Sequence, residues 1–132
     1  CLLGKEIRTT LGNQTREFNY VDNIINGILL VTKKVKHSDK PINLGSNNPV
    51  KIKYLVKEIH KLTNSQSILK IGAMKYRPNE IWKMSANNKF VTHNIGWKPS
   101  VTFGQGLKFS IEWYRKFLKL YFHKKSAFKN LL

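Results

Sequence analysis

The sequence has little cysteine and no long apolar run. Cys1 is the single cysteine among 132 residues, and no apolar stretch approaches the roughly 18 to 20 residues that span a bilayer. One thiol provides neither an internal disulfide nor the paired ligands of a zinc site. These absences exclude a disulfide-stabilised scaffold and a helical membrane span. They are compatible with the reducing cytoplasm, where we place the protein.

The sequence also lacks an initiator methionine, a signal-peptide pattern and a basic amino-terminal arm. We therefore expect the chain to be part of a longer protein. With 132 residues and 41% hydrophobic composition, the chain itself is long enough for one ordinary domain with a core.

Acidic residues are scarce. The chain has 7 Asp and Glu residues against 24 Lys and Arg residues, which gives a net charge of +17. Such a charge suits a polyanion partner, either nucleic acid or an anionic membrane surface. However, the lysines are spread along the whole chain, and abundant lysine and asparagine with scarce arginine are typical of an AT-rich genome. Compositional bias is the favoured interpretation, since isolated lysines usually lie on solvated faces.

Conventional catalytic and metal-binding patterns are missing as well. The 4 histidines are scattered without the spacing of a metal site, so no metal is expected. Ser46 lies in LGSNN, which is not the G-x-S-x-G turn of hydrolases. The acidic residues Glu58, Glu80 and Glu112 are too far apart to indicate a carboxylate pair. No catalytic residue is assigned from these patterns.

The apolar pattern predicts several short strands. They lie at residues 7–11 and 16–21, separated by a Gly12-Asn13 turn, and at 42–44 and 67–72. No glycine-rich phosphate loop follows any of them. The strands alternate with helical segments along the chain, which favours a mixed α/β fold.

Helical periodicity predicts about four helices. One begins at Asp22 and carries the apolar stretch NIINGILLV, and a second covers residues 50–64. A short third helix stops near Gly96, and the strongest pattern runs from Gly106 to about Lys124. The predicted fold class is therefore α/β with short strands.

Two arginines stand out because of where they lie. Arg16 sits beside Glu17 in a short strand that leads into a helix, and Arg77 lies in the loop KYRPNEIW ahead of Glu80. A planar guanidinium offers parallel donors to the oxygens of a diphosphate, and a nearby carboxylate accepts hydrogen bonds from ribose hydroxyls. The same residues are equally consistent with ion pairs, Arg16 with Glu17 or Asp22 and Arg77 with Glu80. Spacing alone leaves both interpretations open.

Three longer stretches carry a family resemblance. They are GNQTREFNYVDNIINGILL, then INLGSNNPVKIKYLVKEI, and then YRPNEIWKMSANNKFVTHNIGWKPSVTFGQGLKFSIEWY. In this order and spacing they resemble the carboxyl-terminal part of the NAD-dependent epimerase/dehydratase family, the extended short-chain dehydrogenases that act on nucleotide sugars. The family motifs are G-x-x-x-x-R-D-[FY]-x-[YH]-V-x-D, a strand ending in N-x-G, and R-x-G-[DE] followed by D-x-S-K, LGW-x-P and EGL-x-x-x-x-W-[YF]. The similarity extends over residues 4 to about 118.

The resemblance assigns roles to the residues that match these motifs. Arg16 stands where the family places an arginine on the nucleotide diphosphate, and Arg77 matches its second phosphate arginine. Glu80 matches the acidic residue that holds the ribose hydroxyls. The segment Thr9 to Leu11, with Thr10 and Leu11 as substrate-binding candidates, corresponds to the stretch whose backbone runs past the base. Packing rather than substrate contact is expected for the framework matches Trp97, Pro99, Gly106, Leu107 and Trp113.

Several positions depart from the family pattern. Asn23 replaces the last Asp of the first motif, which is expected to weaken a cap or ion pair there. The other departures are Glu17 for the usual Asp, Asn79 for a common Gly, and Ala86 and Asn88 for the Asp and Ser of D-x-S-K, although Lys89 is kept. These changes leave the fold intact and bear on the detail of the nucleotide pocket.

The resemblance also implies what lies outside this chain. Family enzymes bind the NAD pyrophosphate with a G-x-x-G-x-x-G loop after a Rossmann strand, and they catalyse with a Tyr-x-x-x-Lys pair. Neither pattern occurs here, since Tyr54 and Lys57 are three positions apart rather than four. NAD would therefore bind to a missing amino-terminal Rossmann half. We expect residues 1–124 to form the nucleotide-sugar-binding region and residues 125–132 a basic tail.

The implied function is that of the substrate-binding portion of an NAD-dependent nucleotide-sugar epimerase/dehydratase, which transfers a hydride at a sugar carbon. The fragment alone is expected to be inactive, and the parent enzyme to be a homodimer that makes activated sugars for polysaccharide. The choice between an isomerase, a lyase and a reductase stays open.

Two alternatives remain, a basic module for nucleic acid or anionic membranes and a decayed gene remnant. Convergence of Arg16, Arg77 and Glu80 would favour the enzyme. A contiguous lysine face would favour the basic module. For the protein itself we expect no specific nucleic acid partner and no membrane span.

Overall fold

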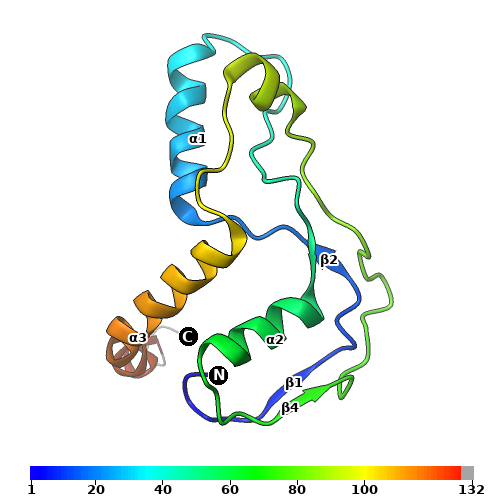
Figure 1. Cartoon of the computed structure of the whole chain (residues 1–132), viewed down its shortest axis with the longest axis vertical. Helices are drawn as coiled ribbons and strands as arrows, with labels where there is room; N and C mark the ends of the chain where they lie inside the picture. Colours follow the sequence, from blue (N-terminus) through cyan, green and yellow to red (C-terminus); the bar gives the residue numbers. More distant parts are fainter. Residues whose placement is uncertain (129–132) are drawn as a thin grey trace.

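The computed structural model describes residues 1–128 of the chain, with side chains up to Leu120. Its elements are, in order, β1 (Ile7–Thr9), β2 (Thr15–Arg16), α1 (Val21–Lys34), β3 (Val50–Lys51), α2 (Ile52–Leu62), β4 (Leu69–Ile71), the π-helical turn η1 (Val91–Ile95) and α3 (Phe103–Phe128). Figure 1 shows α1 beside η1 at one end of the long axis, and α2, α3, β1 and β4 at the other. Short strands with four helices agree with the predicted α/β class.

The strands form two small sheets. β1 pairs in parallel with β4, and β2 pairs antiparallel with β3. The predicted strands 7–11 and 16–21 are therefore shorter than expected, and they belong to different sheets. Gly12 separates them with a positive φ of 67°, and a Cβ on it would lie 2.6 Å from the backbone nitrogen of Lys53. At the predicted turn, the backbone of Gly12 thus lies directly against the first residues of α2.

The strand predicted at residues 42–44 does not form. Ile42 and Leu44 are half-buried and Asn43 is exposed, which is the alternation of a strand with one covered face. Within the described residues, however, no neighbouring strand pairs with them. The prediction is wrong because a strand needs a partner as well as a pattern, and this part of the chain provides none.

A small core joins α1 to η1. Val91, Ile95 and Trp97 are buried, and they pack against the partly buried Leu30, Val31, Val35, Ile42 and Leu44. Gly27 lies on the inner face of α1, where a Cβ would come within 3.0 Å of the Trp97 indole nitrogen. The helix therefore approaches the core closely at this point. The predicted stop of the third helix is confirmed, because Gly96 ends η1 in the left-handed conformation at φ 77°.

Asn23 fastens the start of α1 to the chain that follows η1. Its side chain is 2% exposed. The amide donates to the Val101 carbonyl oxygen at 2.7 Å, and its Oδ1 accepts from the backbone amides of Ser100 and Val101, both at 3.0 Å. The structure thus uses the amide donor, which a carboxylate lacks, at this junction. The expectation that asparagine weakens a cap or ion pair here stays a prediction.

The other two helices agree with their patterns. The apolar residues of α2 are half-buried and α2 packs against α3, in which Ile111 is buried. The backbone of α3 is helical to Phe128, four residues past the predicted end at Lys124. The predicted basic tail at 125–132 thus falls partly on α3 and partly outside the described residues.

Candidate functional site

Two segments that are distant in the sequence run side by side and hold the predicted site residues. The backbone amides of Gly72 and Met74 both donate to the Thr9 carbonyl at 3.0 Å, and the Thr15 amide donates to the Trp82 carbonyl at 2.9 Å. Figure 1 shows the blue and green stretches of chain rising together from β1 and β4. We call the pairing of residues 9–16 with residues 72–83 the seam.

The seam brings Arg16 and Glu80 into direct contact. The Arg16 Nη2 atom lies 2.8 Å from Glu80 Oε1. Arg16 Nη1 donates to the carbonyl oxygens of Thr15 at 2.8 Å and Ile81 at 2.6 Å. The side chains are 21% and 9% exposed. The sequence alternatives that paired Arg16 with Glu17 or Asp22, and Arg77 with Glu80, are therefore wrong.

Arg77 lies at the exposed apex of the same loop. Arg77, Pro78 and Asn79 are all exposed, and the Arg77 side chain makes no hydrogen bond or ion pair with the part of the chain that the structure describes. Three residues later the chain returns to the seam at Glu80. The guanidinium is free to meet a ligand, whereas that of Arg16 is largely engaged.

Thr10 and Leu11 lie at the end of the seam nearest to β1. The Thr10 hydroxyl accepts a hydrogen bond from the Gly12 amide at 3.2 Å, which shapes the turn. The Leu11 side chain is exposed and reaches toward Gly72, where an added Cβ would come within 3.1 Å of it. Both residues therefore border the same seam as Arg16 and Arg77.

Two aromatic residues that contact each other on the seam were not singled out from the sequence. Tyr76 and Trp82 pack edge to face with ring centroids 4.8 Å apart, and Trp82 remains 53% exposed. The Tyr76 hydroxyl accepts a hydrogen bond from the Asn13 amide at 2.9 Å. Their positions on either side of RPNE, the stretch that matches the family motif, are the signal that could have drawn attention to them.

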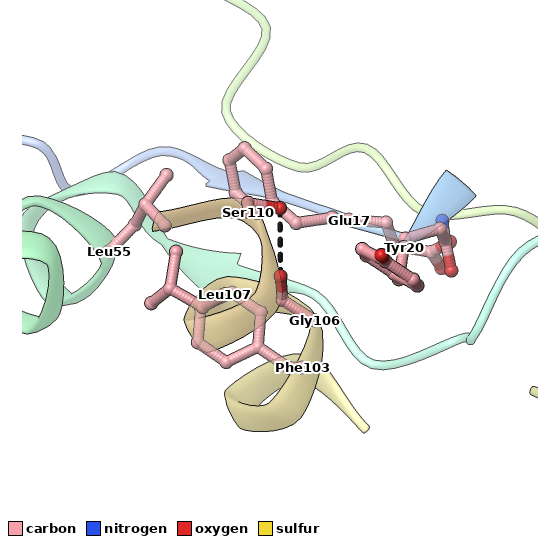
Figure 2. Close-up of a pocket in the computed structure, with 9 residues that line it drawn as sticks. Glu17, Tyr20, Leu55, Phe103, Gly106, Leu107 and Ser110 are labelled. Atoms are coloured by element: carbon pink, nitrogen blue, oxygen red, sulfur yellow. Dashed lines mark hydrogen bonds between the residues drawn. The ribbon is translucent and has the colours of Figure 1, made fainter. Parts of the chain in front are cut away.

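A cavity of about 370 Å³ lies away from these residues, between α3 and the start of α1. Figure 2 shows Glu17, Tyr20, Leu55, Phe103 and Leu107 around it, with the Ser110 hydroxyl donating to the Gly106 carbonyl. The Glu17 carboxylate is already bound, since its Oε1 accepts from the Ala86 amide at 3.0 Å. None of the predicted substrate contacts lines this cavity, and we assign it no role.

Most of the lysines with described side chains are exposed. Three of them, Lys53, Lys57 and Lys61, form one exposed stripe along α2. Among the described side chains, two ion pairs between charged groups form, Arg16 with Glu80 and Lys70 with Glu6, and His37 Nε2 lies 2.8 Å from Asp39 Oδ1. Most of the positive charge is thus not neutralised by ion pairs within the described chain.

Two other kinds of site are absent from the described residues. The described residues contain no cluster of three or more His, Cys, Asp or Glu that could hold a metal ion. In the same part of the chain, no helix is long and apolar enough to cross a membrane.

The sequence is similar to those of known dehydratases and of a synthase. Residues 1–109 match the family model described as GDP-mannose 4,6 dehydratase. Human dTDP-D-glucose 4,6-dehydratase is 33% identical over 110 residues, which covers 80% of this chain and 31% of that protein. CDP-abequose synthase of Salmonella muenchen is 29% identical over 107 residues, covering 79% and 36%.

Solved structures share the fold. UDP-glucose 4-epimerase of Thermotoga maritima, determined with UDP-glucose, superposes with a TM-score of 0.78 at 24% identity, covering 89% of this chain and 37% of that one. UDP-glucose 4-epimerase of Thermus thermophilus, determined with NAD, gives 0.71 at 14% identity, covering 86% and 37%. The chain spans about a third of the length of the curated relatives that it matches.

Proposed function

This chain belongs to the GDP-mannose 4,6 dehydratase family, and from that membership we propose that it is the substrate-binding portion of an NAD-dependent nucleotide-sugar epimerase or dehydratase. The ligand would be a nucleoside diphosphate sugar. The observation that carries this proposal is the seam, which pairs two segments that are distant in the sequence. Arg16 and Glu80, for example, are 64 residues apart. The candidate substrate contacts along the seam are Thr10, Leu11, Arg16, Arg77 and Glu80.

The chemistry of the seam supports a diphosphate ligand. Arg77 is exposed and offers the planar donor set that suits phosphate oxygens. An arginine has five N–H donors, of which Arg16 uses three on the protein, so Arg16 keeps donors for a ligand. Glu80 Oε2 remains for a ribose hydroxyl, since Oε1 is the atom that pairs with Arg16. These contacts bind parts of the substrate that do not react.

NAD does not fit the described residues. A dinucleotide needs a glycine-rich turn between a strand and a helix, with free amides at the helix start. The amides of Ile52 and Lys53 at the start of α2 already donate to the carbonyls of Gln14 at 3.1 Å and Gly12 at 2.9 Å. We propose that NAD, the catalytic tyrosine and its lysine belong to another part of the enzyme, so that residues 1–124 bind substrate and are inactive alone.

The exposed apolar residues of α1 support the proposal that another part of the enzyme covers this helix. The apolar residues of this helix are divided: Leu30 and Val31 pack against the core, whereas Val21, Ile25, Ile28 and Leu29 are exposed. The unpaired segment 42–44 lies against the same core. Since the matched segment makes up about a third of each relative, we propose that a part corresponding to their remaining residues covers this face.

The basic-module alternative ranks second. A polyanion binder needs a contiguous basic face, and the described lysines give one stripe of three along α2. The described residues thus support diffuse attraction to polyanions, not a dedicated site.

Titration of the chain with dTDP-glucose, UDP-glucose and GDP-mannose tests the proposal by calorimetry. We expect one of them to bind, and Arg77→Ala to weaken it by about 1.5 to 3 kcal/mol, the contribution of a hydrogen bond to a charged group. Lys57→Ala on α2 is the control for loss of one positive charge and should leave the affinity unchanged. Equal loss in both variants, or no binding of any of the three, would contradict the proposal.

A further inference from the structure

Three departures from the family motifs lie together in the folded chain. Glu17 stands for the usual Asp, and Ala86 and Asn88 stand for the Asp and Ser of D-x-S-K. Glu17 Oε1 accepts a hydrogen bond from the Ala86 amide at 3.0 Å, and the Asn88 side-chain amide donates to the Gly45 carbonyl at 2.8 Å. We call the meeting of these four residues the Glu17 junction.

Gly45 shows how closely the Glu17 junction is packed. This glycine is buried, and a Cβ on it would collide with Glu17 Oε2 and lie 2.5 Å from the Ala86 Cβ. An aspartate at position 86 would need room for a second carboxylate beside that of Glu17. The small Ala86 side chain and the absent Cβ of Gly45 leave the space that the Glu17 carboxylate fills.

A hydrogen bond to the backbone, rather than an ion pair, holds the Glu17 side chain. None of the ion pairs among the described side chains includes Glu17. The Ala86 amide is a neutral donor, and its bond is strengthened because the acceptor is charged. Removal of the carboxylate would leave this half-buried amide without its partner. Glu17 therefore fastens the end of β2 to the segment that leads into η1.

Arg16 and Glu17 hold the end of β2 from opposite sides. Adjacent residues of an extended chain point in opposite directions. Arg16 reaches the Ile81 carbonyl and the Glu80 carboxylate on the seam, whereas Glu17 reaches the Ala86 amide. The position of β2, and with it the starting point of the Arg16 side chain, therefore depends on the contact that Glu17 makes behind the seam.

We propose that Glu17 is a positioning residue, whose carboxylate holds β2 against Gly45 and Ala86 so that the Arg16 guanidinium meets the diphosphate of the ligand. The inference rests on the proposed function for the identity of that ligand. Alanine at position 86 is the change that admits the longer Glu17 side chain. The departures at these two positions therefore compensate each other, and they act on the site from behind Arg16.

Electrostatics and positioning predict opposite results when Glu17 is removed. A carboxylate repels an anionic ligand, so the loss of one negative charge alone would strengthen the binding of UDP. Positioning predicts that Glu17→Ala weakens UDP binding by about fivefold, measured by NMR titration of the full chain. Glu17→Gln keeps the acceptor oxygen and should bind UDP within about twofold of the native chain. Glu112→Ala removes an exposed carboxylate of α3 and should not weaken binding. Stronger binding by Glu17→Ala would overturn the proposal.

A double-variant cycle tests whether the effect passes through Arg16. In the Arg16→Met background, Glu17→Ala should weaken UDP binding by less than about twofold, since the two effects are coupled. Gly45→Ala, whose Cβ would displace the Glu17 carboxylate, should reproduce the result of Glu17→Ala in both backgrounds. Equal factors for Glu17→Ala in the native and Arg16→Met backgrounds would overturn the proposal, because Glu17 would then act on binding independently of Arg16.

Amide hydrogen exchange without ligand separates this inference from the proposed function. Glu17→Ala should accelerate exchange at Ala86 and also at Thr15, whose amide donates to the Trp82 carbonyl across the seam at 2.9 Å. Glu17→Gln should leave both amides unchanged. The resonance of Trp97, which is buried in the core beside η1, reports that each variant is folded. Unchanged exchange at Thr15 in a folded Glu17→Ala chain would refute the proposal. Failure of UDP to bind the native chain, with exchange accelerated in the variant, would count against the proposed function and not against the hold of Glu17 on β2.

Discussion

Asn23 and Val101 exchange two hydrogen bonds across 78 residues of sequence: the Asn23 side-chain amide donates to the Val101 carbonyl at 2.7 Å, and the Val101 amide donates to Asn23 Oδ1 at 3.0 Å. The Asn23 backbone carbonyl also accepts from the Trp97 indole at 3.2 Å. One buried residue therefore ties the first turn of α1 to both η1 and the approach to α3.

Removal of this junction should destabilise the chain measurably. Asn23→Ala would leave backbone groups of Ser100 and Val101 without partners in a buried place, at a cost of about 1 to 3 kcal/mol. The free energy of unfolding in urea measures the effect. Asn26→Ala, on the exposed face of the same helix, controls for the change in helix propensity and should be nearly neutral. Equal losses in the two variants would show that Asn23 is an ordinary helical residue.

Gly27 and Gly104 should respond oppositely to alanine. Alanine normally favours a helix over glycine by about 1 kcal/mol. At Gly27 the new Cβ would lie 2.9 Å from Leu44 and 3.0 Å from the Trp97 indole nitrogen, whereas at Gly104 nothing lies within 4 Å. We therefore expect Gly104→Ala to raise the thermal midpoint and Gly27→Ala to lower it, with overpacking costing about 1 to 3 kcal/mol. A higher midpoint for Gly27→Ala would mean that α1 does not pack as closely as described.

Local chemistry predicted much of the fold. Apolar periodicity placed α2, predicted at 50–64 and found at Ile52–Leu62, and the left-handed Gly96 ended η1 as expected. What failed was pairing between distant segments. The pattern of residues 7–11 shows a strand but does not say that its partner is β4, and that of residues 42–44 shows a strand where no described partner exists.

The candidate site shows the same division. The family motifs located Arg16, Arg77 and Glu80, but spacing along the chain suggested the nearby Glu17 as a partner for Arg16. The actual partner is Glu80, because the seam brings residue 80 beside β2 through backbone hydrogen bonds that no local pattern encodes. Whether these residues bind substrate remains a prediction.

The exposed face of α1 should make the isolated chain self-associate. Val21, Ile25, Ile28 and Leu29 are between 47% and 57% exposed on one helix, and such patches are aggregation-prone without their cover. Ile28→Lys should lower the association seen by analytical ultracentrifugation. Ile68→Lys is the matched control, since Ile68 is 63% exposed but precedes β4. A monodisperse native chain with one sharp thermal transition would contradict a missing covering part.

Binding to DNA should be weak and governed by salt. Diffuse lysines attract phosphates through counterion release, so affinity should fall steeply between about 50 and 200 mM salt. Joint replacement of Lys53, Lys57 and Lys61 by alanine should weaken binding no more than joint replacement of Lys33, Lys34 and Lys36. Fluorescence anisotropy with a labelled oligonucleotide measures both. A much larger loss for the α2 set, or sequence-selective binding at physiological salt, would favour the basic-module alternative.

The central claim is that the seam is a binding site for a nucleoside diphosphate. The most direct test is to map UDP onto the isotope-labelled chain through its backbone amide resonances. The account predicts that saturable shifts cluster at residues 9–16 and 76–82, and that Arg77→Ala moves their saturation to much higher UDP concentrations while leaving the Trp97 resonance in place. Shifts confined to α2 at Lys53, Lys57 and Lys61, or shifts that Arg77→Ala leaves unchanged, would contradict it.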